Sequence, residues 1–520
     1  MTTKTNGAPP TGSAPKILPQ AGQAGPIGQS GQAGHLGTEK ILSTTQSLCP
    51  VCFGVLGAEL VQIGDEVFMR RECPEHGQFM EAIWRGEPAF EDWRRPKEPA
   101  RGLKIHRQAQ RGCPFDCGLC PEHAQYPCTV LLEITEKCDL RCPVCFASSG
   151  GALARDRDLN ELLENLIYVR AQAGPVVLQL SGGEPTEHPG LLEIVSQAAK
   201  LFPAVQLNTN GLRLAEDPHL AKELRKRGLR WVFLQFDSLR DVNLAAIRGR
   251  PLLERKLLAV ENLEKANLPT VLVPTVIKGV NDQELGALVK FATSKPWVRG
   301  LHFQPMTASG RNGFVGAQSR LTLPELLKEL GRQTDDCVDP TLAFPPGCEH
   351  ERCSFHLRFR RLPDGTLIPR PGQPSDRAKP PKTTHKPSDP AETEASRDRA
   401  VDIILRSWSA GPGPADREQN FEPGSKPAKG LGLGKGLGIP MAGARPPDAF
   451  DEFLAQAARE SFSLTAMAFQ DVWTVDLARL RGCCVHVFDP PDRFVPLCAM
   501  NLTSANGRPL YRGQKAQGAP

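Results

Sequence analysis

Three closely spaced cysteines are the feature that most constrains this chain. Cys138, Cys142 and Cys145 are separated by three and then two residues. Thiolates at this spacing can hold three corners of a four-iron cluster and leave the fourth iron without a protein ligand. A cluster used only for electron transfer is normally closed by a fourth cysteine. The spacing therefore predicts chemistry at an open iron.

The neighbouring residues place this motif at the end of a strand. The apolar, β-rich run 129–135 precedes the cysteines, and a second run, 176–180, leads into Ser181, Gly182, Gly183, Glu184 and Pro185. Adjacent glycines at a strand end let a ligand approach bare backbone. The two loops therefore predict a pocket for a zwitterionic amino-acid group beside the open iron.

Together these loops resemble the radical S-adenosylmethionine (SAM) superfamily. The resemblance implies that the open iron of a [4Fe-4S] cluster chelates SAM, and that Gly182, Gly183, Glu184 and Pro185 hold the methionine amino group. It also implies reductive cleavage of SAM to methionine and a 5′-deoxyadenosyl radical, which abstracts hydrogen from a substrate. The alternative is a structural metal site beside a chance Gly-Gly turn, which leaves the pairing of the two motifs unexplained.

Strand-like and helical runs alternate six times between residues 129 and 310. This alternation predicts an α/β fold with a parallel sheet. The expected architecture is a partial (β/α)6 TIM-like barrel with cysteine-rich N-terminal and C-terminal metal-binding extensions. Active sites of such barrels lie at the carboxyl ends of the strands. Asn210 and Asp237 follow two predicted strands and are candidates for SAM or substrate contacts, with ordinary turn chemistry as the alternative.

A second cysteine group repeats the spacing of the first. It consists of Cys113, Cys117 and Cys120, but no strand precedes it and Cys128 follows. Four thiolates can close a cluster, so an auxiliary [4Fe-4S] site is expected here. His123 is the alternative fourth ligand, and zinc is the alternative metal.

Two further sets of metal ligands flank the core. Cys49, Cys52, Cys73 and His76 match either a Cys3His zinc ribbon or a rubredoxin-like mononuclear iron site. A third auxiliary cluster is predicted from four cysteines on both sides of a long insertion, with one of the adjacent Cys483 and Cys484 left spare and Cys337 a bystander. These four ligands are Cys348, Cys353, Cys484 and Cys498.

The composition divides the chain into segments. The insertion is rich in Gly, Pro and Lys and is expected to be flexible, apart from an apolar run at 401–408 that could form a short docking helix. The predicted segments are a disordered tail (1–45), the metal knuckle (46–95), an auxiliary cluster segment (96–128), the radical SAM core (129–310), the first part of the C-terminal cluster region (311–370), the insertion (371–447) and the rest of the cluster region (448–520).

The whole layout resembles one subfamily, which includes archaeal tetraether lipid synthase and pterin dimethyltransferases. The first functional hypothesis is hydrogen abstraction from an unactivated C–H bond for carbon–carbon coupling of lipid chains. Methyl transfer to a pterin-like small molecule is the alternative, and a non-catalytic iron–sulfur electron carrier is the alternative from another class. The preference for lipid rests on apolar side chains expected at the barrel mouth, namely Phe146, Phe236, Phe303, Phe314 and Val315.

Composition also bounds the partners. The net charge is +5 and there are three tyrosines, which argues against a nucleic-acid binder that needs a basic face and stacking aromatics. No signal-peptide pattern and no run of about eighteen apolar residues is present, so a cytoplasmic protein is expected. The expected partners are a small-molecule or lipid substrate and an electron donor such as a flavodoxin or ferredoxin. A lipid substrate would bring peripheral membrane contact. The sequence identifies neither a catalytic residue nor an oligomeric state.

Overall fold

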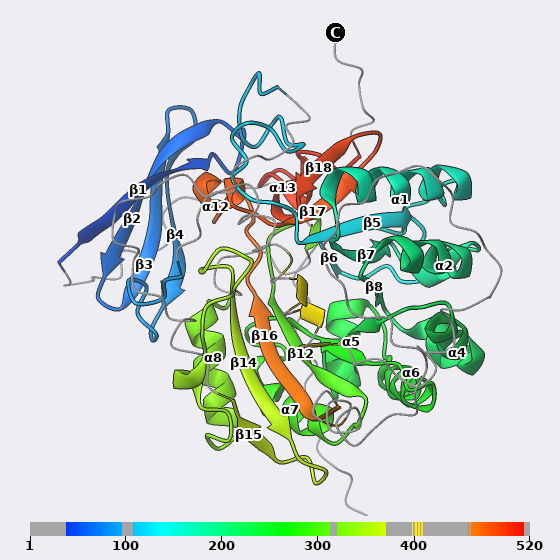
Figure 1. Cartoon of the computed structure of the whole chain (residues 1–520). Coiled ribbons are helices and arrows are strands. Elements are labelled where there is room, and N and C mark those ends of the chain that lie inside the picture. Colours follow the sequence, from blue (N-terminus) through cyan, green and yellow to red (C-terminus); the bar gives the residue numbers. More distant parts are fainter. Residues whose placement is uncertain are drawn as a thin grey trace, which may run out of the picture. The chain divides into compact units, whose positions relative to one another are not determined.

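The computed structural model describes residues 38–95, 108–312, 320–370, 398, 401–402, 404–405, 407–408, 456 and 459–513. These residues form a four-stranded antiparallel sheet near the N-terminus and a larger, mainly parallel sheet that carries the rest of the fold (Figure 1). Phe314 and Val315 lie outside the described residues, as do residues 1–37.

The N-terminal sheet is built from hairpins. Gly64 has a φ of 65°, which the two-residue turn between Ile63 and Glu66 requires. The first strand begins at Lys40, inside the range that the sequence predicted as a disordered tail, because its residues pair with the second strand over its length. The strands are β1 (Lys40–Leu48), β2 (Val55–Ile63), β3 (Glu66–Cys73) and β4 (Gly77–Arg85).

The main sheet contains the six predicted parallel strands, so the α/β prediction is confirmed. They are β5 (Thr129–Thr135), β7 (Val177–Gly182), β8 (Ala204–Thr209), β9 (Trp231–Gln235), β10 (Thr270–Val273) and β12 (Val298–Pro305), each parallel to the next. Helices follow the strands on the outer side of the sheet (Figure 1). The helices are α1 (Leu159–Ala173), α2 (Leu191–Leu201), α3 (Leu212–Glu216), α4 (Pro218–Lys226), α5 (Asp241–Arg248), α6 (Leu253–Lys265) and α7 (Leu285–Thr293).

The C-terminal region widens this sheet at both edges. Strand β16 (Ser461–Met467) pairs parallel with β12, and β17 (Val485–Asp489) pairs parallel with β5. Residues on either side of the insertion therefore complete one sheet. The remaining elements are β14 (Ser354–Arg361) and β15 (Leu367–Pro369) beside β16, β18 (Arg493–Pro496) beside β17, the short strands β6 (Val144–Cys145), β11 (Thr275–Val276) and β13 (Arg311–Asn312), and the helices α8 (Leu323–Gln333), α12 (Leu477–Arg481) and α13 (Leu497–Asn501).

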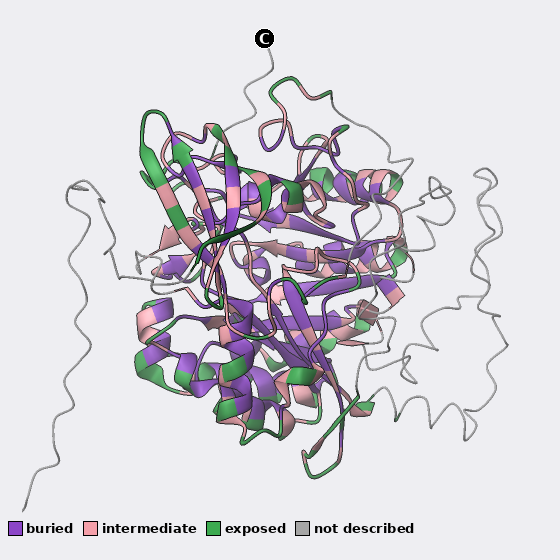
Figure 2. Cartoon of the chain, turned by 90° about the vertical axis from the view of Figure 1, so that its left-hand side faces the viewer, coloured by how far each residue is buried: buried purple, intermediate pink, exposed green. Residues whose placement is uncertain are grey.

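Alternating side chains give the main sheet two faces. In β5, Val130, Leu132 and Ile134 are fully buried in the core that includes Leu162 and Leu166 of α1. Thr129 and Leu131 point to the opposite face, as a period of two residues requires. Figure 2 shows that the strands are mostly buried, while exposed residues gather on the outer helices and on the N-terminal sheet.

Part of the insertion is docked on the main sheet. The structure describes seven helical residues in it, which we call the floor segment: Asp398, Val401, Asp402, Ile404, Leu405, Ser407 and Trp408. Val401 is only 4% exposed and packs against residues at the amino ends of β7, β8 and β9. Most of these residues belong to the apolar run 401–408, for which the sequence predicted a short docking helix, and its apolar side chains pack against the sheet. The other residues of 371–447 lie outside the described part.

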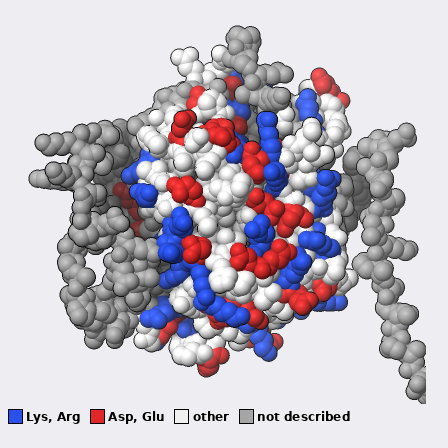
Figure 3. Space-filling view, turned by 90° about the vertical axis from the view of Figure 1, so that its right-hand side faces the viewer, with Lys and Arg blue, Asp and Glu red and all other residues white. Residues whose placement is uncertain are grey.

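None of the described helices combines the length and hydropathy that a bilayer crossing requires. On the face shown in Figure 3, Lys and Arg are interspersed with Asp and Glu and do not gather in one patch.

Candidate active site

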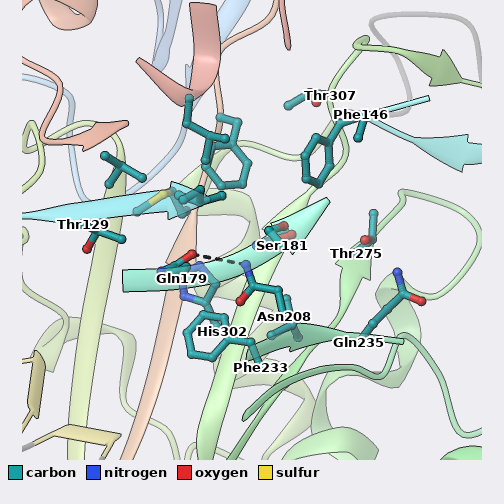
Figure 4. A pocket seen from close by; sticks show the side chains of 18 of the residues that line it. Thr129, Phe146, Gln179, Ser181, Asn208, Phe233, Gln235, Thr275, His302 and Thr307 are labelled. Carbon is teal, nitrogen blue, oxygen red and sulfur yellow. Dashed lines mark hydrogen bonds between the residues drawn. The ribbon is translucent and has the colours of Figure 1, made fainter. Parts of the chain in front are cut away.

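Alternate residues of the main sheet line one cavity of about 490 Å³. The lining pairs include Thr129 and Leu131 of β5, Gln179 and Ser181 of β7, Phe233 and Gln235 of β9, His302 and Gln304 of β12, and Ser354 and His356 of β14. Figure 4 labels several of them, among them Thr129, Gln179 and Gln235. Because strands from most of the sheet contribute to the same cavity, the sheet curls around it as a partial barrel does.

The first cysteine motif lies on this cavity. Cys138, Cys142 and Cys145 all line it, directly after β5. Arg311 holds the loop that carries them: its guanidinium donates to the carbonyl oxygens of Cys142 (3.1 Å) and Ser149 (2.8 Å). Burial raises the pKa of Cys138 to about 12 and also raises the pKa of Cys142. Such thiols do not ionise by themselves, and a bound metal is the charge that would deprotonate them.

The Gly-Gly loop packs directly on the cysteine loop. A Cβ atom on Gly182 would collide with the Thr135 carbonyl oxygen, and one on Gly183 with that of Lys137. The amide of Gly183 donates to Thr135 O (2.8 Å), and the amide of Glu184 donates to Lys137 O (2.7 Å). The glycines are therefore needed for the approach of two backbone segments, a reason that the sequence argument did not identify. Gly182 and Gly183 also line the cavity.

Glu184 connects the ends of two strands. Its carboxylate accepts hydrogen bonds from the hydroxyl groups of Thr186 and Thr209 (both 2.6 Å) and from the amide of Asn210 (2.7 Å). Burial raises its pKa despite these bonds. Asn210 in turn donates to Asp139 beside Cys138 (2.6 Å). Glu184 and Asn210 both line the cavity, whereas Pro185 is not part of the described lining and begins the 3₁₀ helix η1 (Pro185–Glu187).

Asp237, predicted to contact SAM or substrate, is not among the residues that line the cavity. It is fully buried and binds Arg248 through both carboxylate oxygens, at 2.7 and 2.6 Å. Arg248 does line the cavity, and it also donates to the carbonyl oxygen of Val144 inside the cysteine loop (3.0 Å). Burial favours a lower pKa for Arg248, but Asp237 outweighs it and raises that pKa.

The sequence analysis did not identify two buried cationic side chains at the site. Arg248 is one, and Lys256 is the other: its ammonium group donates to the carbonyl oxygens of Asn210 (2.6 Å) and Gln235 (2.8 Å) at the ends of β8 and β9. Burial lowers the pKa of Lys256 to about 8. Both residues lie on helices, where nothing in the spacing distinguishes them from ordinary surface cations.

The middle of the barrel is polar. Asn208 donates to Gln179 (3.2 Å) and accepts from Gln206, while His302 and Thr465 lie 2.8 Å apart (Figure 4). Burial lowers the pKa of His302 to about 4, so its imidazole is neutral near pH 7. These polar side chains share the cavity with apolar ones, among them Leu131, Val144, Val273 and Met306, so the lining is mixed.

Of the three phenylalanines expected at the barrel mouth that the structure describes, two turn away from the cavity. Phe236 and Phe303 are fully buried in the core on the helix side of the sheet, and Phe236 stacks on Phe291 of α7 with ring centroids 5.1 Å apart. Their neighbours Gln235 and Gln304 face the cavity, so the period of two residues directs both rings outward. Phe146 does line the cavity.

The N-terminal sheet carries a compact group of metal-binding side chains. The ligand atoms of Cys49, Cys52, Cys73 and His76 all lie within 4.8 Å of one another. A hydrogen bond with His76 is the main cause that lowers the pKa of Cys73 to about 7. Thiolates about 2.3 Å from one tetrahedral ion would be separated by similar distances, so this set fits a mononuclear site.

The structure divides the second cysteine group differently from the sequence prediction. Cys113, Cys117 and Cys120 line a small separate pocket together with His123, the alternative fourth ligand. Cys128 lies instead beside Cys484, with sulfur atoms 3.2 Å apart. The pairing of β17 with β5 explains this departure, because it aligns Val485 with Thr129 and so brings the preceding residues together.

The C-terminal cysteines fall into two neighbouring groups. Cys348 and Cys484 join Cys128, with all three sulfur atoms within 4.8 Å. Burial and the nearby thiols of Cys498 and Cys353 raise the pKa of Cys483. One of Cys483 and Cys484 was predicted to be spare, but Cys484 joins Cys128 whereas Cys483 lies near Cys353 and Cys498. Cys337 is exposed and belongs to neither group.

Two family descriptions match this architecture. Residues 132–292 match the radical SAM superfamily. The chain contains a radical SAM domain. Residues 41–85 match the HMPTM N-terminal zinc ribbon domain, which spans the compact Cys3His group. The family implies a [4Fe-4S] cluster and SAM, and the three thiols that share one cavity with Gly182 and Gly183 fit both groups.

The curated relatives extend over different shares of the chain. The 7,8-dihydro-6-hydroxymethylpterin dimethyltransferase of Methanocaldococcus jannaschii is 28% identical over 88% of this chain and 93% of its own length. A probable GTP 3′,8-cyclase of Thermococcus kodakarensis is 35% identical, but the match covers 31% of this chain and about half (52%) of that protein. Among solved structures, Streptococcus suis SuiB bound to its precursor peptide SuiA is 16% identical with a TM-score of 0.34, over 42% of this chain and 46% of that chain.

Proposed function

We propose that this radical SAM enzyme transfers methyl groups to a pterin-like small molecule. The observation that carries the proposal is the relative from Methanocaldococcus jannaschii, which aligns along 88% of this chain and 93% of its own length. The polar side chains in the middle of the barrel support the same reading. Lipid-chain coupling, the first hypothesis, loses its main support because Phe236 and Phe303 pack in the core.

The barrel interior suits a flat heteroaromatic ring. A pterin presents several hydrogen-bond donors and acceptors in one plane and needs matching groups held in fixed positions. The cavity offers amide groups and a neutral imidazole that could hydrogen-bond to such a ring, whereas an acyl chain would make no use of them. The matching side chains are Gln179, Asn208, Gln235, His302 and Gln304.

The residues at the carboxyl ends of the strands have separate roles in this proposal. When bound, the cluster and SAM supply reductive cleavage and a carbon-centred radical. Cys138, Cys142 and Cys145 hold the cluster, and Gly182 and Gly183 allow the cofactor loop to lie against it. Arg248 supplies a fixed positive charge beside the thiolates, and Asp237 positions it.

We also propose structural or electron-transfer roles for the other metal ligands. Cys49, Cys52, Cys73 and His76 would hold one zinc or iron ion. Auxiliary clusters would bind at the pocket of Cys113, Cys117 and Cys120 and at the joint region of Cys128, Cys348 and Cys484, with Cys353 and Cys498 nearby. A flavodoxin or ferredoxin remains the predicted electron donor.

The test follows hydrogen from substrate to 5′-deoxyadenosine. Anaerobically reconstituted full-length protein is incubated with SAM, dithionite and 7,8-dihydro-6-hydroxymethylpterin deuterated at its saturated carbons. We expect deuterium in 5′-deoxyadenosine, and a methylated pterin by mass spectrometry when a methyl donor is present. The first readout does not depend on the identity of that donor.

Two controls make the result decisive. The triple variant Cys138→Ala, Cys142→Ala, Cys145→Ala should make no 5′-deoxyadenosine, whereas Cys337→Ala, which changes an exposed cysteine outside every group, should behave as the wild type. Deuterium transfer from a chain-labelled phospholipid and not from the pterin would overturn the proposal in favour of lipid chemistry.

A further inference from the structure

The amino ends of the barrel strands are covered by the floor segment. Val401, Ile404, Leu405 and Trp408 pack on the first residues of β7, β8 and β9, namely Val177, Ala204 and Trp231, and on Val271 of β10. This is the end of the barrel opposite to the cysteine loop, which follows the carboxyl end of β5. At the amino ends of the strands, the cavity is therefore bounded by a segment that lies far away in the sequence.

Trp408 is the aromatic residue of the floor segment, and its ring contacts two residues that line the cavity. Its ring lies edge-on to Phe233, with centroids 4.9 Å apart, and edge-on to His302 at 6.2 Å. Trp408, Ile404 and Ser407 line the same cavity as the three cysteines. The indole ring thus contacts His302, which belongs with Gln179 and Asn208 to the polar middle of the barrel. Figure 4 shows these three polar residues.

The strand residues on which the ring of Trp408 packs lie at the amino ends of the strands, next to the polar middle of the barrel. Parallel barrels normally fill their interior with large side chains from alternate strands. Here Ala204 is small, and Gln206 and Trp231 are joined by a hydrogen bond (2.7 Å). The floor segment packs on these strand residues, and the ring of Trp408 lies edge-on to that of Trp231 with centroids 6.1 Å apart.

We infer that Trp408 is a specificity-determining residue. It closes the cavity at the amino ends of the strands, contributes an aromatic contact to a flat bicyclic ligand and excludes extended chains. The inference rests on the proposed function, because it names the residue that limits the length of the same site. Asp398 and Asp402 of the floor segment are not part of the described lining.

Binding of pterins to three tryptophan variants tests this role. The reconstituted full-length protein is titrated with 7,8-dihydro-6-hydroxymethylpterin, and binding is followed by pterin fluorescence. We expect Trp408→Ala to weaken binding about tenfold, equivalent to about 1.4 kcal/mol, and Trp408→Phe to retain most of the affinity because it keeps an aromatic edge. Trp297→Ala is the matched control, since Trp297 packs under Arg225 outside the cavity lining.

Binding of enlarged ligands distinguishes a residue that limits the length of the cavity from one that only stabilises the fold by packing. Two enlarged pterins are used, one with a butyl group on the 2-amino nitrogen and one with a butyl ether on the 6-hydroxymethyl group. Trp408→Ala should bind at least one of them more tightly than the wild type does, while Trp297→Ala should not. The inference would be overturned if Trp408→Ala bound the parent pterin as tightly as the wild type does and bound neither enlarged pterin.

Hydrogen exchange tests the closing role of Trp408 separately from the proposed pterin substrate. Amides at the amino ends of β7, β8 and β9 should exchange faster in Trp408→Ala than in Trp297→Ala, whether or not a pterin binds. If the wild type binds no pterin but this exchange difference is present, the proposed substrate fails and the closing role of Trp408 stands. Equal exchange in both variants would remove the closing role.

Discussion

At the scale of single residues, the site depends on buried charges that are paired within the protein. Asp237 is fully buried and Arg248 is 5% exposed, and together they form a bidentate ion pair. Removing one partner of such a pair leaves an uncompensated buried charge, which costs far more than the pair contributes. Arg248 also bonds to the cysteine loop, so the pair links the end of β9 to the cluster residues.

Replacement of Arg248 tests this dependence. Arg248→Met should lower the free energy of unfolding by about 3–5 kcal/mol, because Asp237 loses both charged hydrogen bonds. The matched control is Arg255→Met, which breaks an exposed pair with Glu216 (2.8 Å) and should cost less than about 1 kcal/mol. Anaerobic urea unfolding of both variants checks the difference, and equal midpoints would contradict it.

At the scale of elements, two loops at neighbouring strand ends form one unit. The loop after β7 lies against the backbone between Thr135 and Lys137, and hydrogen bonds from Gly183 and Glu184 join the two. No side chain fits between them. The position of the cysteine loop is therefore coupled to that of the Gly-Gly loop through backbone contact, and loss of the contact would uncouple them.

A single added methyl group tests this coupling. Gly183→Ala should displace one loop from the other, because its Cβ would meet the Lys137 carbonyl. We expect SAM affinity to fall at least about tenfold, which corresponds to about 1.4 kcal/mol, as measured by equilibrium dialysis on reconstituted protein. Gly151→Ala is the control, since a Cβ there meets nothing within 4 Å. Equal SAM affinity in the two variants would show that the loops are independent.

At the scale of the whole molecule, the C-terminal region is part of the catalytic sheet and not an appendage. Strands β16 and β17 lie on opposite edges of the predicted core, parallel to β12 and β5. Cysteines that lie far apart in the sequence, Cys128, Cys348 and Cys484, meet there. The metal site and the edge of the sheet should therefore form together.

Iron content tests whether these cysteines form one site. The wild type should carry three four-iron clusters, about twelve irons in all, and one further iron or zinc ion. Cys128→Ser and Cys348→Ser should each remove about four irons, and the double variant should remove no more than either single variant. Additive losses would place the two cysteines in different clusters. Cys337→Ser should keep the wild-type content.

Local sequence pattern determined the chemistry and the core of the fold. The spacing of Cys138, Cys142 and Cys145 and the strand before them sufficed to predict the cluster loop, because ligand spacing and strand periodicity are properties of neighbouring residues. The six βα units followed from the same kind of pattern. The polar interior could also have been read from alternation, since Gln235 and Gln304 occupy the opposite face from Phe236 and Phe303.

Tertiary structure alone decided what meets across the sheet. The grouping of Cys128 with Cys484 arises from strand pairing between residues that lie more than 350 positions apart, and the partner of Asp237 is a helix cation with no distinguishing spacing. Trp408 lies in the apolar run 401–408, whose pattern suggested a docking helix but not where it docks. Its partners on the sheet, Ala204, Trp231 and Phe233, lie far from it in the sequence, so only the tertiary structure could identify them.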